Sequence, residues 1–448
     1  MNDDLRRAVR QVLPGVRTDL DALVRIPSVS AAPGSVEQVR RSAEMTARLF
    51  KDAGAPDVEI LDDIEDGLPA VLARYPAPPG QPTVLLYAHH DVQPAGSPGQ
   101  WSSPPFEPTE RDGRLYGRGA ADDKAGIAAH LAALRAYSGR PPVGVTVLVE
   151  GEEEIGSPNL GTFLARHKDK LDADVIVLAD ADNLTTGTPC LTTALRGMAA
   201  CVVELRALEG GVHSGSYGGG VPDALTALCR LLATLHDEQG NVAVEGLATA
   251  VPPGAPVSEA GFRAEAGLLE GVQLLGSGSI AERIWAKPAA TVLGIDAPPV
   301  ATASPTLTPV ARAKVGLRVA PGDDALKARK ALAGHLRHHT PWGLQVTVVE
   351  AEVAQPFVID ARGPAFDAAR RAYGEAYGND VVDIGSGGSI PFVAEFADAY
   401  PQAAILIASA GADADSRAHG ADESLNLADF ERACLAETLL LAELTRSG

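Results

Sequence analysis

The sequence has little of what marks secreted, membrane or nucleic-acid-binding proteins. Its four cysteines show no C-x-x-C spacing and predict no disulfide framework. The first residues lack the charged-then-apolar order of a signal peptide, and no run of about 18 apolar residues predicts a membrane span. Basic residues number 38 against 58 acidic ones, a net charge of −20 that repels phosphate backbones. We therefore expect a cytoplasmic protein with neither nucleic acid nor a membrane as partner.

The length and the hydrophobic pattern predict an α/β protein of two domains. A chain of 448 residues exceeds one ordinary core. Continuous apolar runs over 84–88, 143–149 and 175–179 predict strands buried on both faces, as in a mostly parallel sheet flanked by helices. Buried-strand runs that alternate with helical segments occur over 1–191 and again over 355–448. We predict that these two parts form one discontinuous catalytic domain.

The segment between those two parts has a different pattern. Over 192–354 the order of predicted elements is β-α followed by β-α-β, which suits a small antiparallel sheet covered by helices. We expect an inserted α/β sandwich of ferredoxin-like type that serves as a lid or dimerisation domain. Its stretch 240–300 is rich in Ala, Gly and Pro and is predicted to be irregular surface.

Residues that bind metals follow the predicted strands. His89-His90-Asp91, Glu152-Glu153-Glu154 and Asp180 each come directly after an apolar run, and the carboxyl ends of parallel strands meet at one edge of a sheet. Asp122-Asp123-Lys124 lies in a Gly-rich turn and His419 in a late loop. Together they supply the imidazoles and carboxylates that hold two divalent metals about 3.5–4 Å apart in hydrolases. This predicts a metal-dependent hydrolase.

Each of these signals has a plainer interpretation when it stands alone. A histidine at a strand end is more often structural, and an acidic run is usually a solvated face. The Asp91 at i+2 favours His89 as a ligand, because metal-bound imidazoles commonly donate their other N–H to a carboxylate. His90 then points to the opposite face. Adjacent Glu153 and Glu154 can divide the roles of ligand and general base, and the pattern alone does not say which takes which.

The motifs together resemble the two-metal exopeptidase family of carnosinases, aminoacylases and glutamate carboxypeptidases, and most of all its carnosinase-like dipeptidases. The motifs are Tyr87-Ala88-His89-His90-Asp91, the Gly-Arg-Gly…Asp-Asp-Lys turn, Glu-Glu-Glu-Ile-Gly-Ser, Val212-His213-Ser214-Gly215 and Gly387-Gly388-Ser389-Ile390-Pro391. The similarity runs from residue 26 to the last predicted helix. It implies that His89, Asp122 and Asp180 bind one metal, and that Asp122, Glu154 and His419 bind the other. It also implies a cis peptide between Asp122 and Asp123.

The resemblance further implies a dipeptidase in which Glu153 is the general base and Asp91 is a catalytic residue that supports His89. It implies two zinc ions per chain, with manganese or cobalt as alternatives. The substrate would be a dipeptide or short peptide with a free C-terminal carboxylate. N-acyl-amino-acid deacylation or carboxypeptidase action at the same site is the alternative. A binding protein without catalysis is disfavoured, because Glu153 and all five ligands are present.

An exopeptidase that acts on short peptides needs a cationic or N–H-rich pocket for the substrate's free carboxylate. Arg318 and the turn with Gly388 and Ser389 are candidates to hold the substrate's carboxylate, although Arg318 by itself reads as a surface strand residue. Gly385-Ser386 departs from the Arg-Glu that is common at this point in the family. The resemblance also implies a homodimer in which His213 reaches the partner's active site, whereas the pattern alone suggests a surface histidine.

Overall fold

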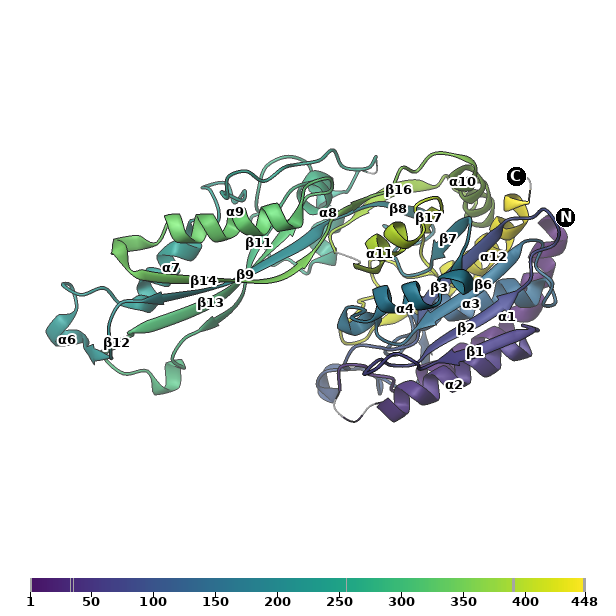
Figure 1. Ribbon diagram of the computed structural model, residues 1–448, viewed down its shortest axis with the longest axis horizontal. Helices are drawn as coiled ribbons and strands as arrows, with labels where there is room; N and C mark the ends of the chain where they lie inside the picture. Colours follow the sequence, from purple (N-terminus) through teal and green to yellow (C-terminus); the bar gives the residue numbers. More distant parts are fainter. Residues whose placement is uncertain (1, 33, 35, 255, 389–390, 446–448) are drawn as a thin grey trace. The chain divides into compact units, whose positions relative to one another are not determined.

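The computed structural model describes residues 2–32, 34, 36–254, 256–388 and 391–445, which divide into two compact units (Figure 1). The first unit comprises Met1–Thr193, Asp360–Ile384 and Phe392–Gly448, and the second comprises Ala194–Ile359 and Gly385–Pro391. The hydrophobic pattern did not predict that the short segment Gly385–Pro391 belongs to the second unit. No helix among the described residues is both long and apolar enough to cross a bilayer.

A six-stranded sheet with the order β1-β2-β6-β3-β7-β17 forms the centre of the first unit. Its strands are β1 (Asp57–Leu61), β2 (Ala70–Tyr75), β3 (Thr83–His89), β6 (Gly144–Glu150), β7 (Val175–Leu178) and β17 (Ala404–Ile407). The four strands from β6 to β17 pair in parallel, and β1 and β2 are antiparallel additions. β6 and β7 are buried along their whole length, so the predicted fully buried strands are confirmed.

Helices cover this sheet. α3 (Lys124–Ala136) packs on β3, α1 (Asn2–Val24) and α12 (Leu427–Leu444) pack on α3, and α2 (Val36–Asp52) packs on β1 and β2. The remaining elements are α4 (Leu160–Arg166), α5 (Lys168–Leu171), α10 (Pro364–Tyr377), α11 (Pro391–Ala399), and two small sheets. The small sheets contain β4 (Thr109–Arg111), β5 (Arg114–Tyr116) and β18 (Ser424–Asn426), and β8 (Cys190–Leu195), β15 (Phe357–Val358) and β16 (Val382–Ser386).

A buried group of hydrogen-bonding contacts joins two of these helices to the sheet. His130 of α3 lies with Nδ1 2.9 Å from both carboxylate oxygens of Glu437 of α12, and its Nε2 lies 3.1 Å from the Tyr87 carbonyl oxygen of β3. Both ring nitrogens thus face acceptors. These contacts fix α3, and with it the turn that precedes α3, against the end of β3.

The strands deliver their carboxyl ends to one edge of the sheet. In the parallel register His89 of β3 lies opposite Glu150 of β6, and Leu178 of β7 lies opposite Tyr87. The polar segments that follow these three strands therefore begin at the same edge, as the sequence predicts.

The second unit contains an antiparallel four-stranded sheet with the order β11-β13-β9-β14. The strands are β9 (Gly197–Arg206), β11 (Ala289–Asp296), β13 (Val310–Val319) and β14 (Gln345–Ala354). α7 (Ala224–Ala233) and α9 (Ala325–His338) pack on this sheet (Figure 1). The core of the unit contains buried side chains such as Leu205, Leu228, Leu317 and Leu332.

The prediction that 240–300 is irregular surface is wrong in part. This stretch contains α8 (Glu259–Glu265), a π-helix at Glu282–Ala286 and the edge strand β11. The edge position gives β11 only one neighbour, so Val292, Leu293 and Ile295 are 41%, 50% and 44% exposed. A strand of this kind lacks the alternating pattern of a half-buried strand, which is why its sequence did not reveal it. A two-stranded ribbon of β10 (Val212–His213) and β12 (Thr306–Leu307) completes the unit, next to the single turn α6 (Ser214–Tyr217).

Candidate metal centre

A first group of donor atoms surrounds His89 at the end of β3. Its buried imidazole has Nε2 3.0 Å from Asp122 Oδ1, 3.9 Å from Glu153 Oε2 and 4.0 Å from Asp180 Oδ2. The donor atoms of His89, Glu153 and Asp180 all lie within 4.8 Å of one another, a spacing that a metal ion can bridge.

A second group surrounds His419. Its Nε2 lies 3.0 Å from Asp122 Oδ2 and 3.1 Å from Glu154 Oε2. Asp122 therefore turns one carboxylate oxygen toward each imidazole, and it links the two groups. The Asp122–Asp123 peptide is cis, as the resemblance implied.

Asp91 lies behind the first group and holds it together. His89 Nδ1 is 3.1 Å from the Asp91 carbonyl oxygen and 3.4 Å from its carboxylate. The same carboxylate accepts hydrogen bonds from the backbone N–H groups of Glu153, at 3.2 Å, and Glu154, at 3.0 Å. Asp91 thus orients an imidazole and the two glutamates at once. His90 takes no part, because its Nε2 lies 2.8 Å from the Pro69 carbonyl oxygen.

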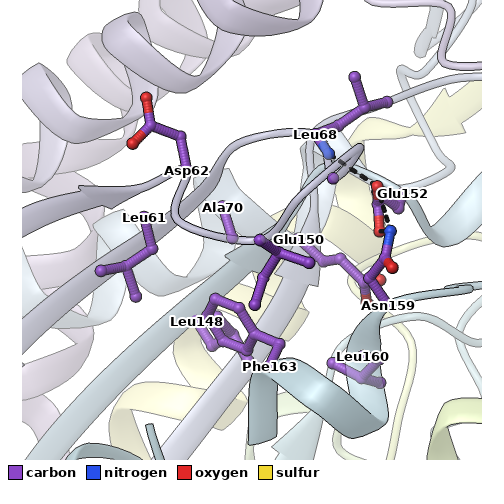
Figure 2. Close-up of a pocket in the computed structure, with 12 residues that line it drawn as sticks. Leu61, Asp62, Leu68, Ala70, Leu148, Glu150, Glu152, Asn159, Leu160 and Phe163 are labelled. Carbon is purple, nitrogen blue, oxygen red and sulfur yellow. Dashed lines mark hydrogen bonds between the residues drawn. The ribbon is translucent and has the colours of Figure 1, made fainter. Parts of the chain in front are cut away.

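The acidic run after β6 divides into an outer and an inner part. The Glu152 carboxylate accepts hydrogen bonds from the backbone N–H of Leu68, at 2.7 Å, and from the Asn159 amide, at 3.1 Å, in a small pocket beside the site (Figure 2). Glu154 is held by Gln93, whose backbone N–H donates to Oε1 at 3.0 Å. The other oxygen of Glu154 is the one that faces His419, so the outer contact aims the carboxylate inward.

The pKa values of the site are shifted by burial and by the crowding of carboxylates. Burial, and next the charge of Asp122, raises the pKa of Asp180 to about 7. Burial also raises the pKa of Glu153 well above its usual range, with Asp180 adding to the effect and His89 opposing it. Hydrogen bonds with Asp122 and Glu154 raise the pKa of His419 to about 10. Carboxylates crowded in this way need cations or shared protons, and imidazoles with carboxylates suit divalent transition metals.

A buried carboxylate that the sequence did not single out organises both ligand loops. Glu423 Oε1 accepts hydrogen bonds from the backbone N–H groups of Ala121, at 3.0 Å, and Asp122, at 3.1 Å. Its Oε2 accepts from the Gly119 N–H at 3.1 Å and pairs with the buried guanidinium of Arg118. Side chains that bind backbone amides of a distant turn leave no spacing signal. The only hint was that Glu423 follows His419 closely.

Arg118 and Gly119 complete this arrangement. Arg118 Nη2 donates to the His419 carbonyl oxygen at 3.0 Å and to the Gly420 carbonyl oxygen at 3.1 Å, so it ties the His419 loop to the turn. Gly119 has φ +79°, and a Cβ there would lie 2.5 Å from Val92 Cγ1, so only glycine fits. The loop itself is unusual, because His419 has φ +64°. Its carbonyl contacts to Arg118 hold that conformation.

The remaining predicted residues belong to the second unit. Arg318 lies on β13 and is half-buried, Gly388 follows β16, and His213 is exposed at the end of β10. Ser389 lies outside the described residues. The structure therefore brings together His89, Asp91, Asp122, Glu153, Glu154, Asp180 and His419, all in the first unit.

Comparison with known proteins gives consistent results. Residues 85–443 match the sequence profile described as Peptidase family M20/M25/M40. The chain is 40% identical over 367 residues to the cysteinylglycine-S-conjugate dipeptidase of Corynebacterium striatum, covering 80% of each sequence. It is 30% identical over 435 residues to the Beta-Ala-His dipeptidase of Rattus norvegicus, covering 89% of this chain and 86% of that one. The solved structure of the di-peptidase Dug1p from Saccharomyces cerevisiae has a TM-score of 0.81 at 23% identity and covers 100% of this chain and 99% of its own.

The Glu423 contacts generate a prediction about metal affinity. Glu423→Gln places an amide N–H₂ against backbone donors, which loosens the turn with Asp122 and the loop with His419. We expect the affinity for Zn²⁺ to fall about 10- to 100-fold, the usual loss when a residue that orients a ligand is changed. Isothermal titration of the metal-free protein measures it. Glu431→Gln, on the exposed face of α12, is the matched control and keeps the original affinity. An unchanged affinity in folded Glu423→Gln protein contradicts this role.

Proposed function

The chain belongs to peptidase family M20/M25/M40, and from this premise we propose that it is a two-metal dipeptidase. It hydrolyses the peptide bond of dipeptides or short peptides that carry a free C-terminal carboxylate. The observation that carries the proposal is Asp122, which presents one oxygen to His89 and the other to His419 at 3.0 Å each. A carboxylate shared between two ligand groups in this way is suited to bridging two cations.

His89, Asp122 and Asp180 would hold one metal, and Asp122, Glu154 and His419 would hold the other. Zinc is the metal that we propose, with manganese or cobalt as alternatives, because the donors are imidazole nitrogens and carboxylate oxygens. When bound, such a pair supplies Lewis-acid polarisation of the substrate carbonyl and lowers the pKa of a coordinated water.

Glu153 is the proposed general base. It belongs to the His89 group, and its backbone N–H is fixed by Asp91 at 3.2 Å. A raised pKa suits a carboxylate that must first accept a proton from the attacking water and then donate it to the leaving amine. Asp91 keeps both His89 and the Glu153 backbone in place, so it acts on the reaction through its neighbours.

We propose that the substrate's carboxylate binds to Arg318 and the turn that contains Gly388 and Ser389. Burial lowers the pKa of Arg318, and no carboxylate among the described residues opposes that shift, which supports a role in binding an external anion. Both curated relatives are named for dipeptides. N-acyl amino acids and longer peptides also end in a carboxylate, so deacylation and carboxypeptidase action are the alternatives. Parallel assays of glycine-terminated dipeptides, N-acetyl amino acids and tripeptides distinguish the three.

The proposal includes a cytoplasmic homodimer. All four cysteines are free, with only Cys229 exposed, which suits a reducing compartment. The exposed apolar side chains on edge strand β11 support an interface in the second unit.

Removal of metal tests the whole proposal. Treatment with a chelator should abolish dipeptide hydrolysis, because without cations no water in the site is activated at neutral pH. Addition of Zn²⁺, Mn²⁺ or Co²⁺ should restore it, and elemental analysis should find two metals per chain. Full activity in a preparation shown to be metal-free would falsify the proposal.

Two neighbouring glutamates provide the next test. Glu153→Gln should leave the metal content near normal and lower kcat by about 10²–10⁴, the usual range for a general acid–base group. Glu154→Gln should instead lower metal occupancy, because its carboxylate faces His419. Metal analysis and steady-state kinetics on both variants measure this. Glu431→Gln, on the exposed face of α12, is the control and should change neither property. The reverse pattern would mean that the two roles are exchanged.

His213 generates a prediction about cooperation between subunits. Its Nδ1 accepts the Gly215 N–H at 3.1 Å, so the neutral ring carries its proton on Nε2, a donor suited to an oxyanion. We propose that it serves the partner's active site. His213→Ala should keep metal and dimer but lose about 10²–10³ in kcat, as for one oxyanion donor. Heterodimers of His213→Ala with Glu153→Gln should regain activity, since one site then has both groups. If verified heterodimers recover no activity, His213 acts within its own subunit or has no part in catalysis.

A further inference from the structure

The turn at 385–388 sits in a tight notch of the second unit. A Cβ on Gly385 would lie 2.6 Å from Trp285 Cβ, and a Cβ on Gly387 would lie 2.8 Å from Arg196 Nη2 and 3.3 Å from the Ile284 carbonyl oxygen. Neither glycine has a positive φ, so space and not backbone conformation requires glycine here. The turn is therefore shaped by what it is pressed against.

Arg196 lies between this turn and the segment that contains Trp285, and it forms hydrogen bonds with both. Its Nε donates to the Gly387 carbonyl oxygen at 3.3 Å, and its backbone N–H donates to the Ser386 carbonyl oxygen at 3.2 Å. On the other side its Nη1 donates to the carbonyl oxygens of Arg283 and Lys287, each at 3.4 Å. Those two residues belong to or follow the π-helix at Glu282–Ala286, a rare element that is frequent at functional sites. One guanidinium thus clamps the turn to the π-helix.

The guanidinium of Arg196 is buried near a second positive charge. Burial, together with the neighbouring positive charge of Arg318, lowers the pKa of Arg196 to about 10. Among the described residues, the Arg196 guanidinium donates only to backbone carbonyl oxygens, and no carboxylate contributes to the lowered pKa of Arg196 or of Arg318. Two guanidiniums that share a partly buried region without a counterion favour binding of an external anion.

We propose that Arg196 is a positioning residue for recognition of the substrate's carboxylate. It fixes the turn 385–388 in its binding conformation, and its charge adds to the field of Arg318. This inference rests on the proposed function, because it deepens the account of how the dipeptide is held. It assigns to Arg196 no contact with the reacting atoms.

The test compares free dipeptides with their C-terminal amides. Arg196→Met should raise KM for a glycine-terminated dipeptide about tenfold or more, while kcat for it changes less than about threefold. Hydrolysis of the matching amide, which lacks the carboxylate, should change little. Arg196→Lys keeps a positive charge but loses the guanidinium that joins the turn to the π-helix. Its KM should therefore lie between that of the unchanged protein and that of Arg196→Met. Arg312→Met, at a half-exposed position on the same sheet, is the control and should match the unchanged protein.

A second variant addresses the possibility that Arg196→Met does not fold. Gly385→Ala adds one methyl group against Trp285 and should displace the turn, which predicts the same loss of preference for the free carboxylate. Metal content and thermal unfolding report whether either variant keeps its structure. Equal losses on dipeptide and amide, or no change in KM in folded variants, would overturn the inference. Failure of the unchanged protein to hydrolyse any dipeptide would instead reject the proposed function.

Discussion

The buried carboxylate of Glu423 is the contact on which the metal centre depends. It gathers the N–H groups of Gly119, Ala121 and Asp122, and its partner Arg118 binds the carbonyl oxygens of the His419 loop. The proposed ligands are mostly carboxylates, which repel one another in a partly buried site. An outer layer of hydrogen bonds must hold them before any cation arrives. Glu423 and Asp91 provide that layer by accepting backbone N–H groups of Asp122 and Glu154, and Gln93 adds to it by donating its own backbone N–H to the Glu154 carboxylate.

The two units carry different parts of the proposed chemistry. All residues proposed to bind metal or move protons lie in the first unit, on the edge formed by the ends of β3, β6 and β7. The residues proposed to recognise the substrate, Arg318, the turn at 385–388 and His213, belong to the second. This separation lets one catalytic arrangement serve different substrates, because changes in the second unit alter recognition without touching the metal ligands.

The sequence predicted what strong local patterns encode. Long apolar runs identified β3, β6 and β7, and the polar residues after them identified most of the site, since the ends of parallel strands must meet. Edge strand β11 was missed because its apolar residues are exposed and follow no alternation. Glu423, Arg118 and Arg196 were missed for another reason. Each binds backbone groups of segments far away in the sequence, and neither residue type nor spacing reports such contacts. The Asp91 at i+2 favoured His89 as a ligand, whereas the division of roles among the other proposed ligands and Glu153 came from the resemblance.

The departure at Gly385-Ser386 has a physical explanation in this structure. Where the resemblance leads us to expect Arg-Glu, Trp285 fills the space that a side chain at position 385 would need. At position 386, the serine hydroxyl accepts the Gly388 N–H at 3.1 Å and so closes the turn on itself. With Gly-Ser at these positions, the turn packs against Trp285 and Arg196 and carries no charged side chain of its own.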